Sequence, residues 1–237
     1  MNAFFTDLAD QFTMSFITND RWKLYLKGLG MSLLIAVFAL ALGIALGVIV
    51  AVVRTKHDQN KKHISKGLAF ANVICQIYTT VIRGTPTMVQ LLIMGFVIFA
   101  SSKQYFLIAV LALGINSGAY VSEIIRGGIM SVDIGQMEAG RSLGMNYSTV
   151  MKDIIIPQAI KNILPALGNE MITLFKDTSL VSVIGMTELT KVARDIQART
   201  YQPFMPYIGI AIMYLVVCMI LTYLQGKLER RLRRSDR

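Results

Sequence analysis

The stretch GLGMSLLIAVFALALGIALGVIVAVV, Gly28–Val53, runs for 26 residues without a charged side chain. An α-helix rises about 1.5 Å per residue, so this stretch is long enough to cross the roughly 30 Å hydrocarbon core of a bilayer. It contains GIALG, Gly43–Gly47, whose small residues allow another helix to pack closely. The stretch predicts a membrane-spanning helix and, with it, a helical membrane protein.

The composition of the whole chain agrees with this prediction. Of its 237 residues, 54% are hydrophobic and only 16% are charged, and the mean hydropathy is +0.54. Soluble domains have about a quarter of their residues charged. The net charge of +10 comes from clusters between uncharged runs, without a basic face interleaved by aromatic residues, so we expect no nucleic-acid partner.

Cysteine and histidine are sparse and do not form a metal-ligand pattern. Cys75 and Cys218 lie in separate apolar runs, and His57 and His63 lie in a lysine-rich connector without clustered ligands. We expect packing cysteines and solvated loop histidines, and therefore no metal site.

Four further segments are long and poor in charge, which predicts an all-α integral membrane fold of about five transmembrane helices. The second segment has 36 residues, too many for one straight helix, and Pro86 favours a break after Arg83, Gly84 and Thr85. It forms either one broken span or two full spans. The segments are Gly67–Ser102, Gln104–Ser122, Asn162–Thr187 and Thr200–Gly226.

The distribution of lysine and arginine decides between these alternatives. With a single broken span, residues 54–66, 123–161 and 227–237 share one side and carry 15 of these residues, against seven on the other side. The positive-inside rule then predicts that the N-terminus is outside and the C-terminus is in the cytoplasm of a bacterium, with the chain in the cytoplasmic membrane. Two full spans would break this asymmetry.

The two ends of the chain have different predicted environments. Residues 1–27 hold Phe12, Phe16, Trp22 and Tyr25 among scattered charges, which is typical of an extracytoplasmic segment at the membrane interface. Residues 227–237, KLERRLRRSDR, form a basic cytoplasmic tail suited to anionic lipid headgroups.

A short helix is predicted within the cytoplasmic connector, in IGQMEAGRSLGM, Ile134–Met145. Asp133 can cap its start, Gln136 can cap back, and Gly144 can end it. About ten residues of helix are too few to be stable alone in water, so the helix must pack against something else, such as a partner protein.

Glu138, Ala139, Gly140 and Gly144, followed by Ile154, Ile156 and Pro157, resemble the EAA loop of binding-protein-dependent ABC importer permeases. Gly140 stands where the family usually has alanine, and Ile156 where it has leucine. Residues 28–226 resemble the ABC transmembrane type-1 domain as a whole. Similarity to the polar amino acid branch extends over RGTPTMVQLL (83–92), EIIRGGI (123–129), GQMEAGRSLG (135–144), IIPQAI (155–160) and KDTSLVSVIG (176–185).

This resemblance implies a coupling helix that docks on a cytoplasmic ATP-binding subunit dimer. It further implies a second permease subunit, identical or related, and an extracytoplasmic amino-acid-binding protein. The chain has no phosphate-binding G-x-x-x-x-G-K-[ST] loop, so it is not expected to be an enzyme or to hold a cofactor; ATP and Mg would bind the partner ATPase. The residues assigned to coupling are Gln136, Glu138, Ala139, Gly140, Gly144 and Pro157.

Charged residues inside predicted spans suggest a substrate path, since burying a charge in a bilayer is costly. On a helix, Glu170, Thr173 and Asp177 share one face. Asp177, Thr178 and Ser179 could cap a new segment where the span breaks. The alternative is that these charges join helices as structural contacts. Glu123 and Arg126 are expected to form a local ion pair without a transport role. The candidate path residues are Arg83, Thr85, Glu170, Thr173, Lys176, Asp177 and Ser179.

The sequence therefore predicts a permease subunit of an ATP-driven importer for a polar amino acid. Arg83 with Glu170 or Asp177 can pair with the carboxylate and amino groups of an amino acid, and the additional acid favours a basic one; glutamine, glutamate and cystine stay open. An ion-gradient-driven carrier or channel acting without an ATPase is the alternative. A membrane scaffold that does not transport would have no need of costly intramembrane charges.

Overall fold

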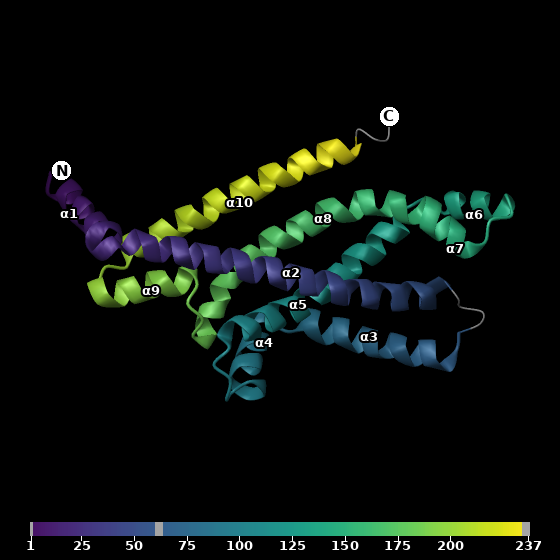
Figure 1. Cartoon of the computed structure of the whole chain (residues 1–237), viewed down its shortest axis with the longest axis horizontal. Helices are drawn as coiled ribbons and strands as arrows, with labels where there is room; N and C mark the ends of the chain where they lie inside the picture. Colours follow the sequence, from purple (N-terminus) through teal and green to yellow (C-terminus); the bar gives the residue numbers. More distant parts are fainter. Residues whose placement is uncertain (1, 60–63, 234–237) are drawn as a thin grey trace. The chain divides into compact units, whose positions relative to one another are not determined.

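A computed structural model describes residues 2–59 and 64–233, and throughout these ranges the secondary structure is helical, without a strand (Figure 1). His63 and the end of the basic tail lie outside the described residues. The α-helices are α1 (Asn2–Phe12), α2 (Arg21–Gln59), α3 (Lys66–Gly84), α4 (Thr87–Ile93), α5 (Tyr105–Met130), α6 (Ile134–Ser142), α7 (Tyr147–Val150), α8 (Ile156–Asp177), α9 (Leu189–Thr200) and α10 (Phe204–Arg233). Short π-helical turns occupy Thr13–Ile17, Met94–Ile98 and Met151–Ile155, and 3-10 turns occupy Thr18–Asp20 and Thr178–Ile184.

Three helical segments in the described chain are long and apolar enough to cross a membrane: Thr6–Asp58, which is kinked at Asn19 and Asp20, α5 and Phe204–Leu232. Helix α3 and the segment Thr87–Ile98 satisfy the same criterion together, as a pair separated by a short break. Helix α8 has 22 residues, enough to span by length, but it is more polar. These five segments correspond to the five spans expected from the sequence.

The break after α3 lies where Pro86 predicts it. Thr85 has an extended backbone, with φ −120° and ψ 144°, as expected for a residue that precedes a proline. Its hydroxyl donates a hydrogen bond to the carbonyl of Val81 at 2.8 Å. The side chain of Thr85 thus binds a carbonyl at the end of α3, where the helix can no longer supply an amide donor.

The described chain divides into two compact units, and each contains parts of several helices. Unit 1 comprises residues 1–39, 87–113 and 173–220, and unit 2 comprises residues 40–86, 114–172 and 221–237. Four helices, α2, α5, α8 and α10, contribute to both units.

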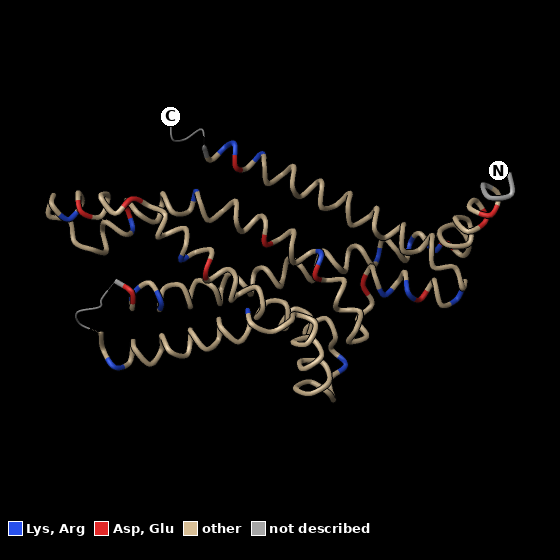
Figure 2. The backbone as a smooth tube through the Cα atoms, turned by 180° about the vertical axis from the view of Figure 1, so that it is seen from behind, with Lys and Arg blue, Asp and Glu red and all other residues tan. Residues whose placement is uncertain are grey.

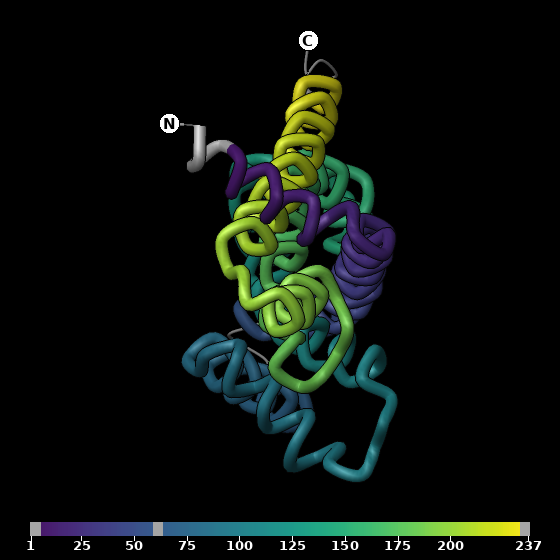
Figure 3. The backbone as a smooth tube through the Cα atoms, turned by 90° about the vertical axis from the view of Figure 1, so that its left-hand side faces the viewer, coloured from purple at the N-terminus to yellow at the C-terminus, as the bar shows by residue number. Residues whose placement is uncertain are grey.

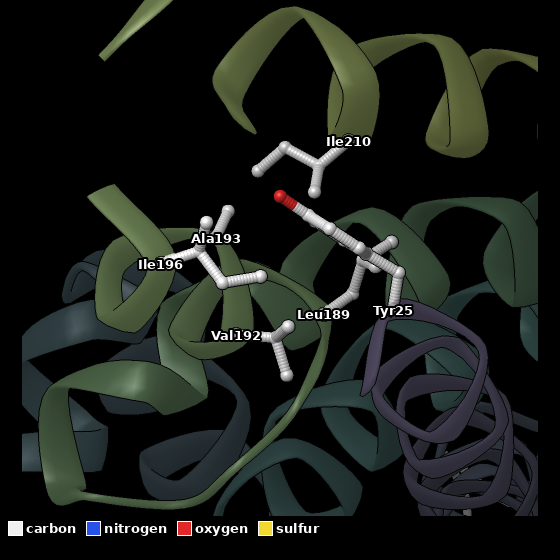
Figure 4. Packing of buried hydrophobic residues seen from close by; sticks show 6 residues of the cluster. All are labelled: Tyr25, Leu189, Val192, Ala193, Ile196 and Ile210. Carbon is white, nitrogen blue, oxygen red and sulfur yellow. The ribbon is translucent and has the colours of Figure 1, made fainter. Parts of the chain in front are cut away.

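The core of unit 1 forms where α9 packs against the starts of α2 and α10 (Figures 3 and 4). Tyr25 of α2 is only 1% exposed and lies among Leu189, Val192, Ala193 and Ile196 of α9 and Ile210 of α10. The ring of Phe16 stacks on Tyr25, with 4.8 Å between the ring centroids. Tyr25 is therefore a core residue of unit 1, a contact that the sequence did not predict.

Close packing of α2 against α5 organises unit 2. A Cβ atom added at Gly43 would lie 2.9 Å from Cβ of Ser117, and one added at Gly47 would lie 2.8 Å from Cβ of Val121. Such distances leave no room for any side chain. The GIALG segment is therefore a helix-packing face, as the sequence predicted.

Candidate functional site

Helix α6 contains the predicted coupling residues and begins with the cap predicted at Asp133, whereas the predicted return bond from the Gln136 side chain is not formed within the described chain. The Asp133 carboxylate accepts a hydrogen bond from the backbone N–H of Gly135 at 2.6 Å. The backbone N–H of Gln136 donates to the carbonyl of Asp133 at 3.0 Å. Two of the amides left without helical acceptors at this end are thereby satisfied, one of them by the Asp133 side chain.

The end of α6 has a glycine cap. Gly144 has φ +83°, its N–H donates to the carbonyl of Arg141 at 3.0 Å, and the N–H of Met145 donates to the carbonyl of Gly140 at 3.2 Å. This pair of bonds defines a Schellman cap, which favours glycine because a side chain is unfavourable at positive φ. The helix stops after nine residues because both of its ends are specified locally.

One face of α6 packs on the chain that follows it. Gly140 is buried, and a Cβ atom there would lie 2.8 Å from a methyl group of Val150 and 3.4 Å from one of Ile154. This close approach explains why glycine occupies position 140, where the EAA loop usually has alanine. The coupling residues Gln136, Glu138 and Ala139 are exposed.

Apolar side chains also lie in solvent around α6. Ile134 at its start is 74% exposed and Leu143 at its end is 82% exposed. An apolar cavity of about 400 Å³ adjoins the start of the helix, and Pro157 is exposed in the first turn of α8. The residues lining this cavity are Ile129, Met130, Val132, Asp133, Ile134, Met137, Tyr147, Met151 and Ile155.

A second polar group in unit 2 surrounds Glu123. Arg126 is 3.2 Å from Glu123, which confirms the predicted local ion pair. Arg54 of α2 also pairs with Glu123, and Arg83 at the end of α3 lies 3.7 Å from the same carboxylate. The Arg83 guanidinium stacks over the ring of Tyr120, 5.7 Å from its centroid. Three arginines from three helices thus share one carboxylate.

A polar cavity of about 350 Å³ adjoins this group, and its lining residues are Arg54, Gln76, Thr79, Thr80, Arg83 and Glu123. Arg83 is about half exposed, so its charge is accessible from this cavity. Guanidinium groups and hydroxyls are donors that suit an anion such as a carboxylate.

Glu170, another predicted path residue of unit 2, is half-buried on α8. Its carboxylate accepts a hydrogen bond from the hydroxyl of Ser117 on α5 at 2.7 Å. Figure 2 shows how few acidic residues interrupt the uncharged lengths of the long helices. A carboxylate in such surroundings is expected to have a partner or a ligand.

The other predicted path residues lie in unit 1, at the end of α8. Thr173 and Lys176 are exposed, and Asp177 and Ser179 are half-buried. The helix ends at Asp177 and continues as a 3-10 turn, so the predicted break is present. The cap predicted at Asp177 is wrong, because its side chain makes no capping bond. Thr178, also predicted to cap, donates from Oγ1 back to the carbonyl of Phe175 at 2.7 Å.

A fully buried carboxylate was not anticipated from the sequence. Glu188 precedes α9, and its carboxylate accepts hydrogen bonds from the N–H groups of Thr190 and Lys191 at 2.8 and 2.7 Å. The hydroxyls of Ser32 and Tyr214 donate to it as well, at 3.3 and 3.2 Å. Glutamate is not among the residues that usually signal an N-cap, so the sequence indicates neither this capping role of Glu188 nor its burial.

Burial raises the pKa of the Glu188 carboxyl because the charged form loses its hydration. The backbone amides of Thr190 and Lys191 and the hydroxyls of Tyr214 and Ser32 act in the opposite direction, since they favour the charged form. Desolvation is the larger effect, so the pKa lies above that of an ordinary glutamate.

Comparison with known proteins gives consistent matches over most of the chain. Residues 66–234 match the family described as "Binding-protein-dependent transport system inner membrane component". The arginine transport system permease protein ArtQ of Bacillus subtilis is 40% identical over 214 residues, which are 89% of this chain and 93% of that protein. The glutamine transport system permease protein GlnP of Escherichia coli K12 is 35% identical, with coverage of 89% and 93%.

Solved structures agree with these matches. The crystal structure of an amino acid ABC transporter with histidines has a chain that is 44% identical, with a TM-score of 0.80, covering 88% of this chain and 94% of that one. The MetNI methionine ABC transporter in an inward-facing conformation has a TM-score of 0.76 at 14% identity, covering 91% and 99%. The second similarity concerns the fold alone.

Proposed function

Because this chain belongs to the family of binding-protein-dependent transport system inner membrane components, we propose that it is a permease subunit that imports a basic amino acid, driven by a separate ATPase. That it is the permease subunit of an amino acid ABC importer follows from its similarity to the arginine and glutamine permeases. The chain is the membrane component and not itself the enzyme.

The geometry of α6 carries the proposal of ATPase coupling. The helix is capped at both ends, its inner face packs on Val150 and Ile154, and Glu138 projects from an exposed face between two exposed apolar residues, Ile134 and Leu143. Exposed apolar ends on a short rigid helix fit a groove on a partner protein. In this proposal, an ATP-binding subunit dimer offers two such grooves and therefore takes two permease subunits.

The preference for a basic substrate rests on acidic residues near the proposed path. Glu170 is half-buried and hydrogen-bonded to Ser117, and Asp177 is half-buried at the end of the same helix, α8. A carboxylate favours the cationic side chain of arginine or lysine over the neutral amide of glutamine. In unit 2, Arg83 beside its polar cavity supplies a complementary group for the carboxylate of an amino acid.

We further propose that the N-terminus is outside and that α6 and the basic tail are in the cytoplasm, with the tail on anionic lipid headgroups. An extracytoplasmic amino-acid-binding protein would then deliver the substrate to the opposite side. Residues 28–226 would form the transmembrane domain.

Uptake into proteoliposomes tests this proposal. Vesicles that hold the permease and its ATPase subunit, with ATP inside and the binding protein outside, are expected to accumulate labelled arginine or lysine. Accumulation that requires neither ATP nor the binding protein, but follows an imposed ion gradient, would instead support the carrier alternative.

A further inference from the structure

Helix α9 has one face in the core and a basic face in solvent. The core face is formed by the residues that surround Tyr25, namely Leu189, Val192, Ala193 and Ile196 (Figure 4). At 3.6 residues per turn, Lys191, Arg194, Asp195, Ala198 and Arg199 fall within one contiguous arc outside the core face, with Arg199 at the edge of the arc next to Val192. Figure 2 shows basic and acidic residues along this helix.

This arc carries a net positive charge. Lys191 and Asp195 pair with each other, one turn apart. Arg194 and Arg199 are exposed, and no ion pair joins either of them to another described residue. Two guanidinium groups are therefore presented to solvent without an internal counter-charge.

The start of α9 is held in place by buried polar contacts. The Glu188 carboxylate binds two backbone amides of α9 and the hydroxyls of Ser32 on α2 and Tyr214 on α10. The hydroxyl of Ser32 also accepts from the N–H of Leu189 at 3.3 Å. A buried carboxylate with four donors fixes one orientation of a helix because the loss of any donor is costly. The exposed arc is thus a preorganised surface.

Tyr201, just after α9, provides an independent observation. It caps the helix in the left-handed conformation, with φ 55°, and its side chain is 85% exposed. This conformation costs a non-glycine residue roughly 1 kcal/mol or more relative to glycine. Tyr201 thus adopts an unfavourable backbone conformation although its aromatic ring does not contribute to the core. This combination points to a role in binding rather than in folding.

We propose that Arg194, Arg199 and Tyr201 form a docking surface, here called the α9 surface, for an acidic face of the extracytoplasmic binding protein. The inference rests on the proposed function, which puts α9 outside. Arginine and tyrosine are the side chains most often found at the energetic centres of protein interfaces, and unpaired guanidinium groups are complementary to carboxylates. Anionic lipid headgroups would pair with the same arginines, and tyrosine also suits a membrane interface, so lipid binding is an outcome that the experiment separates from docking.

The test is a titration of ATP hydrolysis in proteoliposomes of neutral phosphatidylcholine that hold the permease with its ATPase subunit. The arginine-loaded binding protein is added, and its half-maximal concentration is measured for the unaltered chain and for the double variant Arg194→Glu/Arg199→Glu. We expect an increase of about tenfold or more in the double variant, with the same hydrolysis rate at saturation. The half-maximal concentration of the unaltered chain should also rise with ionic strength, because salt screens the attraction.

Tyr201→Gly separates docking from folding. Glycine tolerates the left-handed conformation, so the variant keeps the cap and loses only the aromatic ring. We expect thermal stability to be kept or raised and the half-maximal concentration to rise about fivefold. Lys103→Glu is the matched charge control, because Lys103 is exposed in unit 1 but outside α9, and it should change the half-maximal concentration by less than about twofold.

The possible outcomes distinguish the α9 surface from the proposed function. An unchanged half-maximal concentration in both the double variant and Tyr201→Gly, or an equal change in Lys103→Glu, would reject the α9 surface. An effect of the double variant that appears only when anionic phosphatidylglycerol is added to the vesicles would reject it in favour of lipid binding. Lack of any stimulation with the unaltered chain would reject the proposed function as well.

Discussion

Ser117 on α5 donates a hydrogen bond to Glu170 on α8, with 2.7 Å between the hydroxyl and carboxylate oxygens. The two residues are 53 positions apart in the chain, so the contact joins separate membrane helices. The hydroxyl stabilises the charged form of the carboxylate without adding a charge of its own.

Glu170→Gln is expected to weaken transport of arginine and lysine at least about tenfold more than transport of glutamine. The amide is nearly isosteric but lacks the charge that attracts a cationic side chain. The measurement is uptake of each labelled amino acid by proteoliposomes with the complete transporter. Ser117→Ala is the control, since it removes the hydrogen bond but keeps the charge, and it should preserve the order of substrate preference. Equal loss for all three substrates in Glu170→Gln would count against a direct role.

Gly47→Ala is expected to destabilise the protein by about 1 to 3 kcal/mol, because its methyl group would lie 2.6 Å from a methyl group of Val121 and would push α2 away from α5. Gly30→Ala is a control in the same helix, since nothing lies within 4 Å of the added atom. That variant should be neutral or stabilising by up to about 1 kcal/mol. Thermal unfolding in detergent compares the two, and equal melting temperatures would contradict the packing of these helices.

Gly144→Ala is expected to destabilise the end of α6 by about 1 to 2 kcal/mol, because alanine is strained at φ +83°. Gly144→Asn should be milder, since asparagine tolerates this conformation. Protease sensitivity of the 134–150 segment is the direct measurement. If alanine and asparagine were equally harmful there, a requirement other than backbone conformation would have to explain Gly144.

Glu188 is expected to make stability depend on pH. Its pKa is raised in the folded protein, so the fold binds the proton more tightly than the unfolded chain. The associated stability is fully present below the ordinary glutamate pKa of about 4.3 and is lost as the pH rises through the raised pKa. Glu188→Gln should remove this part of the dependence. The test is to measure the melting temperatures of the unaltered protein and of Glu188→Gln from about pH 4 to about pH 8. Parallel curves would contradict it.

The sequence predicted the uncharged spans, the break at Pro86 and both ends of α6, because each of these depends on local properties. The spans follow from hydropathy, the break follows from the backbone N–H that proline lacks, and the ends of α6 follow from capping residues. It predicted Arg126 as a partner of Glu123 but not Arg54, which lies 69 positions away in the chain, nor Arg83. It did not predict that α9 covers Tyr25, and it did not reveal the burial of Glu188. Both features depend on tertiary contacts between α9 and α2, which are far apart in the sequence, and no local sequence pattern predicts such contacts.

Stimulation of ATP hydrolysis by the amino-acid-loaded binding protein, compared between the unaltered chain and Glu138→Lys, tests the central claim most directly. Glu138 is exposed on α6, so the substitution reverses a surface charge without disturbing the packing of Gly140. We predict that the unaltered transporter is stimulated, and that Glu138→Lys assembles in the membrane but loses most of the stimulation. Full stimulation in the variant, or substrate movement through this chain alone without ATP, would contradict the account.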